Sequence, residues 1–358
     1  MKHVLITAGG TGGHVFPALA VAQLMREQGW RVSWLGTANR MEAQVVPAAG
    51  FDFTGVEQQG LRGRGFFGWL IAPFRLVRSV YKMRHFLANI KPDLVIGFGG
   101  YTAGPAGIAA WTKGIPLVIH EQNAAAGLTN KLLARFAKKV LVGFQAAKQQ
   151  LPASIFVGNP VRSDIAGLIN NPVKMPVAPF KLLVVGGSLG AEHLNQVVPA
   201  AVANMNDFSI EVWHQTGRGK QTEVMAAYGA REGVRVTEFI DDMAQAYQQA
   251  DLIICRAGAL TCSEIACVGR ASILVPYPHA VDNHQLLNAQ ALAAAGAAQV
   301  IEQRDLSSAC LQSELQTLLK DPELLLRMAE NARKAAVNDA DQAVVNVCNE
   351  LLKGSQHE

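Results

Sequence analysis

Four glycines, a threonine and a histidine make up the stretch "GGTGGH", residues 9–14, one residue after the apolar run "HVLIT". Glycine lets the backbone approach an anion closely, and the first N–H groups of a following helix point at it. An imidazole has an ordinary pKa of about 6.5, so it can take up a proton near neutral pH. The stretch therefore indicates an anion-binding loop with a proton acceptor, His14, at its end. A tight turn that binds nothing is the alternative.

A second glycine-rich stretch, "VVGGSLGA" at residues 184–191, also lies between an apolar run and a helical one. Its backbone N–H groups suit an anion, and the hydroxyl of Ser188 adds a further donor. The spacing is neither GxGxxG nor GxxxxGK[ST], so it disfavours dinucleotide binding and P-loop chemistry. A purely structural turn is the alternative interpretation.

The sharpest signal is "CRAGALTCSE", residues 255–264, which completes the apolar run "DLIIC". We expect a helix from Ala259 or Leu260, with Thr261 and Ser263 in its first turn. Its open N–H groups and its dipole would then hold a diphosphate. The carboxylate of Glu264 suits the two hydroxyls of a ribose, so the stretch matches a nucleoside diphosphate. An acid that only caps the helix is the alternative.

Further polar residues follow other predicted strands, at the ends where parallel sheets bind ligands. "HEQN" places Glu121, Gln122 and Asn123 after one strand, and "GNPVR" brings Arg162 to the junction of the two halves. After "ASILVPYP" comes a cluster whose side chains suit a sugar: His279, Asp282, Asn283, His284 and Gln285. Because its two histidines lack the spacing of a zinc site, we expect no structural metal.

Residues 62–91 hold seven Lys or Arg and no acid, which is more positive charge than the net +4 of the whole chain. We expect a helix from Pro73 to about Asn89. Its cationic face comprises Arg75, Arg78, Lys82 and His85, and its apolar face comprises Leu76, Val80, Met83 and Leu87. With Phe66, Phe67 and Trp69 nearby, this pattern is typical of a helix at an anionic membrane surface. A core helix with a solvated basic side is the alternative.

These residues need a scaffold, and the chain alternates short β-rich runs with helical stretches throughout. Such alternation predicts parallel sheets covered on both faces. Because "FKLLVVGG" restarts the opening pattern, we expect two tandem Rossmann-like, doubly wound α/β domains with a cleft between them. The predicted domains span residues 1–160 and 161–338, and a final helix at 339–358 packs back on the first domain.

Composition narrows the function classes. With 358 residues, 50% hydrophobic and 17% charged, the chain is globular rather than disordered. "MKHVLITAGG" lacks a signal-peptide pattern, and the uncharged segment 94–112 is too rich in glycine for a membrane span. The basic segment carries no recognised nucleic-acid module, so we expect no nucleic-acid partner.

The motifs "GGTGGH", "HEQN", "GNPVR", "GGSLGA" and "GALTCSE", in this order, resemble those of the bacterial N-acetylglucosaminyltransferases of peptidoglycan synthesis. The resemblance covers essentially the whole chain. It implies the two-domain GT-B fold and transfer of GlcNAc from UDP-GlcNAc to undecaprenyl-diphosphate-linked MurNAc-pentapeptide. It also implies a peripheral position on the cytoplasmic face of the inner membrane. We expect no required cofactor, and whether a divalent cation assists is left open.

The resemblance also implies a set of donor-binding residues, with His284 as an alternative to Gln285. They are Thr11, Gly12, Gly13, Asn123, Arg162, Ser188, Ile240, Ala259, Leu260, Thr261, Cys262, Ser263, Glu264 and Gln285. An inverting transfer needs a base for the acceptor's C4 hydroxyl, and His14 is the first candidate and Glu121 the alternative. Two competing functions share these features: a UDP-GlcNAc 2-epimerase, and a GT-B transferase with another acceptor.

Overall fold

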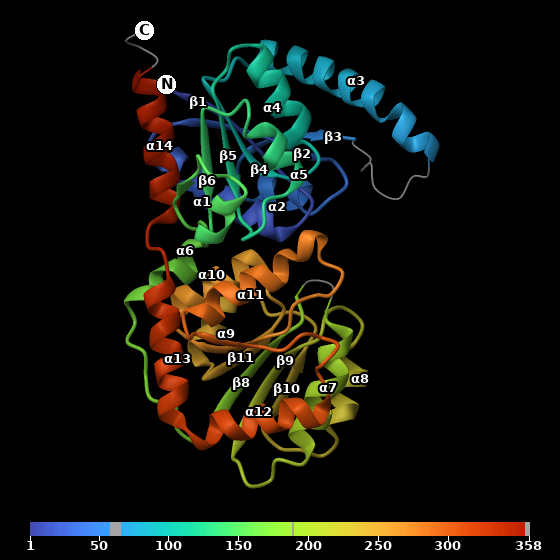
Figure 1. Cartoon of the computed structure of the whole chain (residues 1–358), viewed down its shortest axis with the longest axis vertical. Helices are drawn as coiled ribbons and strands as arrows, with labels where there is room; N and C mark the ends of the chain where they lie inside the picture. The colour runs from blue at the N-terminus through green and yellow to red at the C-terminus, as the bar shows by residue number, and fades with distance from the viewer. Residues whose placement is uncertain (58–65, 188–189, 355–358) are drawn as a thin grey trace. The chain divides into compact units, whose positions relative to one another are not determined.

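The computed structural model of the chain describes residues 1–57, 66–187 and 190–354, without the side chains of 66–73 (Figure 1). It divides into two compact units. The first comprises Met1–Arg162 together with Asp339–Glu358, and the second comprises Ser163–Asn338. These boundaries lie beside the predicted ones at 160/161 and 338/339.

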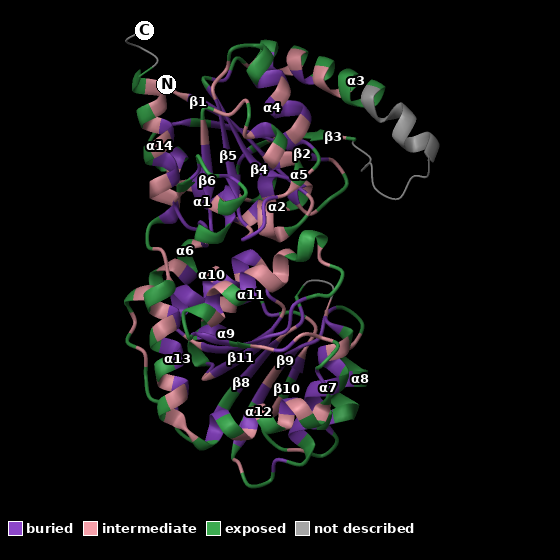
Figure 2. Ribbon diagram, in the orientation of Figure 1, coloured by how far each residue is buried: buried purple, intermediate pink, exposed green. Residues whose placement is uncertain are grey.

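The first unit is built on a seven-stranded sheet in the order β3-β2-β1-β4-β5-β6-β7, and all neighbouring strands run parallel. Its inner strands are continuous apolar runs because helices cover both faces of the sheet, and Figure 2 shows these strands buried. The strands are β1 His3–Ala8, β2 Arg31–Thr37, β3 Asp52–Val56, β4 Leu94–Gly99, β5 Leu117–Glu121, β6 Lys139–Val142 and β7 Ile155–Phe156.

Helices of this unit fill the connections between its strands. Two hydrophobic clusters on opposite faces of the sheet share its alternating side chains, so that Ile6 faces one cluster and Leu5 the other. The helices are α1 Gly12–Glu27, α2 Glu42–Ala48, α3 Phe66–Ile90, α4 Ala103–Thr112, α5 Leu128–Leu133, η1 Gln145–Gln149 and α14 Ala340–Gly354.

The second unit repeats this plan with a six-stranded parallel sheet in the order β10-β9-β8-β11-β12-β13. Its strands are β8 Phe180–Val185, β9 Ile210–Gln215, β10 Val234–Thr237, β11 Leu252–Cys255, β12 Ala271–Leu274 and β13 Ala298–Val300. Its helices are α6 Ser163–Ala166, η2 Gly167–Asn170, α7 Glu192–Ala203, α8 Gln221–Tyr228, α9 Met243–Gln249, α10 Ala259–Val268, η3 Val281–Asn283, α11 His284–Ala294, α12 Ser308–Lys320 and α13 Pro322–Ala335. The predicted fold of two Rossmann-like domains is confirmed.

Both sheets reverse their strand order at one place, between β1 and β4 in the first unit and between β8 and β11 in the second. Ligands of such sheets bind beyond the carboxyl ends of the strands at this switch point. Glycines stand at or after the ends of all four strands: several at 9–13, 99–100 and 186–190, and the single Gly258 after β11. The topology therefore places the loops singled out in the sequence where ligands bind.

The basic helix α3 differs from its prediction in two ways. It begins at Phe66 rather than at Pro73, so the proline lies inside the helix. Of the predicted apolar face, Met83 and Leu87 are buried in the core, where the C-terminal half of α3 packs on α4. The face of α3 that solvent reaches instead carries Phe74, Val77 and Tyr81. Leu76 of the predicted apolar face is 41% exposed, so that face divides along the helix between solvent and the core.

The last helix, α14, packs against α1 in the first unit (Figure 1). Val344, Val345 and Cys348 are buried in the same cluster as α1. In the described part of the chain, no helix has the length and apolar character needed to cross a membrane.

We expect Val345→Ala to lower the stability of the first unit by about 2 kcal/mol, because it removes buried methyl groups and leaves a cavity. The corresponding fall in the unfolding midpoint is about 4–8 °C for a domain of this size. Calorimetry of the full chain checks this, with Glu350→Ala on the exposed side of α14 as the control. Equal midpoints for the two variants would contradict the packing of α14.

Candidate active site

The first glycine loop is held by a carboxylate that the sequence analysis missed. Glu42, at the start of α2, is completely buried. Its Oε1 accepts hydrogen bonds from the backbone N–H groups of Thr37 (3.0 Å) and Gly10 (3.2 Å), and its Oε2 lies 3.3 Å from the same Gly10 nitrogen. A Cβ on Gly9 would lie 2.4 Å from Oε1. The loop therefore needs glycine at position 9 to close over this carboxylate.

Two glycine loops of the first unit meet backbone to backbone. A Cβ on Gly100 would lie 2.4 Å from the Gly9 carbonyl oxygen, and Gly100 has a φ of +89°. A Cβ on Gly99 would lie 2.9 Å from the imidazole of His14. The loops after β1 and β4 thus form one surface, and His14 lies on it.

At the switch points, three helices begin with backbone N–H groups that the side chain of the N-cap residue does not cap. The N-cap residues of α1, α7 and α10 are Thr11, Ala191 and Gly258, and none of them makes a side-chain capping bond. By contrast, Asp242, Ser307 and Asp321 cap α9, α12 and α13. Because the first N–H groups of a helix have no intrahelical acceptor, α1, α7 and α10 present donors suited to an anion.

His14 begins a chain of hydrogen bonds that we call the histidine relay: His14, Gln122 and His120. His14 Nδ1 lies 2.8 Å from Gln122 Oε1, Gln122 Nε2 lies 3.1 Å from His120 Nδ1, and His120 Nε2 lies 2.9 Å from the Gly158 carbonyl oxygen. His120 and Gln122 are buried, whereas His14 is half-buried. Burial lowers the pKa of His120 to about 4, so its ring is neutral near pH 7.

Glu121 lies beside the relay but is fully engaged elsewhere. Its Oε1 accepts from the backbone N–H and the side-chain amide of Asn123, and its Oε2 accepts from the Gly127 N–H and the Asn130 amide, at 2.8–3.1 Å. Only 2% of Glu121 is exposed. Four donors occupy its two oxygens, so the carboxylate shapes the turn 122–130 and holds Asn123 in place.

"GNPVR" supports the same site. Gly158 supplies the carbonyl that ends the relay, and the amide of Asn159 donates to the Gln122 carbonyl oxygen at 3.0 Å. Arg162 places its guanidinium over the ring of Phe16, 5.5 Å from the centroid. The ring of Phe16 lies beside Gly12, where an added Cβ would be 3.0 Å from it. The cation of Arg162 therefore lies next to the first turn of α1.

In the second unit, the glycine loop after β8 is held by Gln215, another residue missed in the sequence. Its Oε1 accepts from the Gly187 N–H at 2.9 Å, and its Nε2 donates to the carbonyl oxygens of Gly187 and Glu238 at 3.1 Å and 2.7 Å. Ser188, predicted to bind the donor, lies outside the described residues. Gln215 thus fixes the backbone immediately before it.

The helix expected near Ala259 begins there, as α10. Leu260 and Cys262 are buried, and burial raises the pKa of the Cys262 thiol to about 12, so their side chains belong to the core. Ser263 Oγ donates back to the Ala259 carbonyl at 3.0 Å. Any contact of Leu260 or Cys262 with a donor therefore falls to the backbone of α10.

Glu264 is 8% exposed, and its Oε2 accepts from the hydroxyl of the buried Tyr247 at 3.0 Å. Tyr247 fixes this carboxylate from the protein side. Gln285 Oε1 accepts from the Tyr277 N–H at 2.9 Å. His284 Nδ1 lies 2.7 Å from the Val281 carbonyl. Ile240, after β10, is buried.

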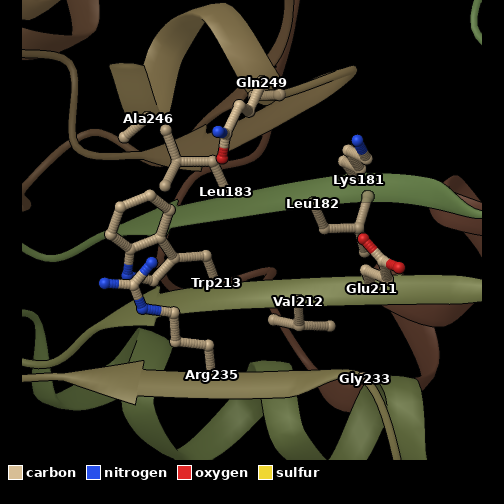
Figure 3. Close-up of a pocket in the computed structure, with 11 residues that line it drawn as sticks. Lys181, Leu182, Leu183, Glu211, Val212, Trp213, Gly233, Arg235, Ala246 and Gln249 are labelled. Atoms are coloured by element: carbon tan, nitrogen blue, oxygen red, sulfur yellow. The ribbon is translucent and has the colours of Figure 1, made fainter. Parts of the chain in front are cut away.

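A cavity of about 160 Å³ lies elsewhere in the second unit, between the first halves of β8, β9 and β10 and the end of α9 (Figure 3). Trp213 lines it, and the guanidinium of Arg235 lies 3.9 Å from the centre of the indole ring. The switch-point loops leave the opposite ends of these strands, so this cavity is separate from the candidate site. Among the described residues, no cluster of three or more His, Cys, Asp or Glu is arranged to hold a metal ion.

We expect Gln215→Leu to weaken about 10-fold the affinity for UDP, the nucleotide that the sequence resemblance implies, because the Gly187 backbone loses the hydrogen bonds that preset the loop. Isothermal titration with UDP measures this. Gln221→Leu is the matched control, since Gln221 also donates to a backbone carbonyl, that of Val236, but does not touch the loop. Unchanged affinity in Gln215→Leu would show that the loop needs no such clamp.

Comparison with known proteins agrees with this architecture. Relatives from Aeromonas hydrophila and Shewanella amazonensis are 51% and 50% identical, over 99% and 98% of this chain and 98% of each relative. Both are named UDP-N-acetylglucosamine--N-acetylmuramyl-(pentapeptide) pyrophosphoryl-undecaprenol N-acetylglucosamine transferase. The crystal structure of Acinetobacter baumannii MurG is 39% identical and matches 98% of this chain and 100% of that chain, with a TM-score of 0.83.

The UDP-GlcNAc 2-epimerase of Neisseria meningitidis is only 13% identical, over 98% of this chain and 100% of that chain, with a TM-score of 0.68, which shows a shared fold alone. Sequence models of the glycosyltransferase family 28 N-terminal and C-terminal domains match residues 4–142 and 181–344. The predicted relationship to the peptidoglycan N-acetylglucosaminyltransferases is confirmed. The chain is a glycosyltransferase and belongs to glycosyltransferase family 28.

Proposed function

We propose that this chain transfers GlcNAc from UDP-GlcNAc to the C4 hydroxyl of the MurNAc residue in undecaprenyl-diphospho-MurNAc-pentapeptide, with inversion at the anomeric carbon. The names of relatives about half identical over the full length support these two substrates. The observation that carries the chemistry is His14, which is half-buried at the switch point of the first unit beside an open helix N-terminus.

The second unit supplies groups that suit the leaving nucleotide. Negative charge grows on the β-phosphate as the bond to the sugar breaks, and backbone donors fixed in advance stabilise such charge. The uncapped N-termini of α7 and α10 present donors of this kind. Tyr247 donates a hydrogen bond to the carboxylate of Glu264, and a carboxylate suits the two hydroxyls of a ribose. Departure of UDP then needs no acid.

His14 is a better base than Glu121. A base needs an unoccupied acceptor atom within reach of the attacking hydroxyl. Both oxygens of Glu121 already accept hydrogen bonds inside the protein, and the residue is 2% exposed. His14 is half-buried, and only its Nδ1 faces Gln122. We therefore assign proton removal to His14 and loop positioning to Glu121.

We further propose that helix α3 attaches the protein to the cytoplasmic face of the inner membrane. Phe74, Val77 and Tyr81 are 78%, 69% and 74% exposed, at spacings of three and four residues that place them on one side of the helix. Arg75, Arg78 and Lys82 are exposed beside them. Basic and bulky apolar residues together favour an anionic lipid surface. Phe66, Phe67 and Trp69 belong to this prediction, but their side chains lie outside the described residues.

Trp111 extends this surface onto α4. It is 51% exposed, and its neighbour Thr112 accepts a hydrogen bond from Arg84 of α3 at 2.9 Å. Arg84 follows Tyr81 by three residues, so it lies on the same side of α3. We therefore include the exposed Trp111 in the proposed membrane face.

Transfer of labelled GlcNAc from UDP-GlcNAc to a lipid-linked MurNAc-peptide tests the main proposal. We expect β-1,4-linked product, and a decrease in kcat of about 10²–10⁴-fold in His14→Ala, which is the usual contribution of a general base. His193→Ala is the control, because His193 lies in the second unit, where its Nε2 is 2.9 Å from the Leu306 carbonyl oxygen. Conversion of UDP-GlcNAc alone to UDP-ManNAc would identify an epimerase instead, and full turnover of His14→Ala would remove it as the base.

Neutralising Arg75, Arg78 and Lys82 to Gln should weaken binding to anionic vesicles about 100-fold, at about 1 kcal/mol for each charge near such a surface. Sedimentation with vesicles that contain phosphatidylglycerol measures the bound fraction. The control neutralises Arg304, Lys320 and Lys334, which are exposed on the second unit. Equal losses in both variants would indicate a general charge effect rather than a docking face.

A further inference from the structure

The histidine relay fixes where protons lie, beginning with the amide of Gln122. Its Nε2 lies 3.1 Å from the backbone carbonyl oxygen of His120 as well as 3.1 Å from His120 Nδ1. A carbonyl oxygen only accepts hydrogen bonds, so the atom facing it must be the amide nitrogen. The amide oxygen Oε1 is consequently the atom that faces His14, and it too can only accept. His14 Nδ1, at 2.8 Å, must therefore carry a proton.

A second backbone carbonyl, at the other end of the relay, fixes the same direction of hydrogen-bond donation. The Gly158 oxygen lies 2.9 Å from His120 Nε2, which must be protonated to donate to it. A neutral His120 then has its lone pair on Nδ1, ready to accept from the Gln122 amide. Burial, the dominant cause, lowers the pKa of His120, against the opposing influence of Gly158 and Glu121. A protonated His120 would turn an N–H toward the amide NH₂ and reverse the relay.

We infer that Gln122 and His120 are positioning residues that hold neutral His14 with its proton on Nδ1 and its lone pair on Nε2. This inference rests on the proposed function, in which Nε2 is then the atom that removes the acceptor's proton. In that step the acceptor O–H bond breaks, an N–H bond forms at Nε2, and the oxygen bonds to the anomeric carbon. The bond from that carbon to UDP breaks, and its electron pair leaves on the phosphate oxygen.

Space around the ring supports the assignment. A Cβ on Gly99 would lie 2.9 Å from His14 Nδ1 and Cε1 and 3.3 Å from Nε2. The ring therefore packs against a backbone position that has no side chain, and Gln122 fixes its rotation through one nitrogen. A ring turned by 180° would bring a carbon to Gln122 Oε1 and lose the hydrogen bond. The relay thus sets both the tautomer and the orientation of His14.

Nitrogen-15 NMR of the full chain with labelled histidine reports the tautomer of His14 without an activity assay. We expect His14, assigned by loss of its signals in His14→Gln, to show a protonated Nδ1 and an unprotonated Nε2 at a pH where it is neutral. A proton on Nε2 overturns the inference even if GlcNAc transfer is intact. Absence of transfer with the expected tautomer instead overturns the proposed function.

Variants test whether the relay matters for turnover. Gln122→Met removes the amide, and we expect kcat to fall about 10- to 100-fold while KM for UDP-GlcNAc stays within about 2-fold. Gln122→Glu keeps an acceptor oxygen toward His14 but places its second oxygen against the His120 carbonyl, so it should recover only part of kcat. Its acid limb should move to higher pH, because a carboxylate beside an imidazole favours the protonated ring, which is no longer a base.

His3→Gln is the matched control, since His3 is also buried and hydrogen-bonded, to Ser33 at 2.9 Å, at the far end of β1. A relay that only stabilises the fold would give the same tautomer and pH profile in all variants that fold. That result, or equal losses of kcat in His3→Gln and Gln122→Met, overturns the inference. If Gln122→Met does not fold, the tautomer in the wild-type chain and the pH profile of Gln122→Glu decide the question.

Discussion

The position of the candidate site residues in the first unit depends on the close approach of two backbone segments. The loops after β1 and β4 touch at Gly9 and Gly100, where a single Cβ would lie 2.4 Å from a carbonyl oxygen. No side chain can be inserted at that point without moving a strand end. Because Gly99 also has no side chain, the imidazole of His14 can pack directly against the backbone there. The position of the proposed base therefore depends on glycines that perform no chemistry themselves.

Each unit fixes its first loop with one buried polar side chain, which lies at or just after the end of its second strand. In the first unit it is Glu42, whose carboxylate can only accept and therefore gathers backbone N–H groups. In the second it is Gln215, whose amide both accepts from and donates to Gly187. The two units thus solve the same problem with different chemistry. A loop held in advance loses less conformational freedom when it binds a phosphate.

The sequence revealed the architecture and the loops because both leave local signals. Apolar runs, helical periodicity and glycine clusters are visible in any short window, and they predicted two doubly wound units and the start of α10. Residues that act through distant partners gave no such signal. Glu42 looks like a surface acid in "NRMEAQ" until its contacts with Gly10 are known. Periodicity on α3 likewise could not separate a side that faces α4 from one that faces solvent, since both are apolar.

The stretch "HEQN" shows how one strand end serves two purposes. Successive residues of an extended chain point to opposite sides, so His120 and Gln122 share one side and Glu121 lies on the other. On one side the ring of His120 stacks on Phe98, and the amide of Gln122 reaches His14. On the other, four donors gather on Glu121 and shape the turn that carries Asn123. A shift of one residue would exchange the carboxylate with the relay and remove both arrangements, so the order of these residues, and not only their presence, determines the site.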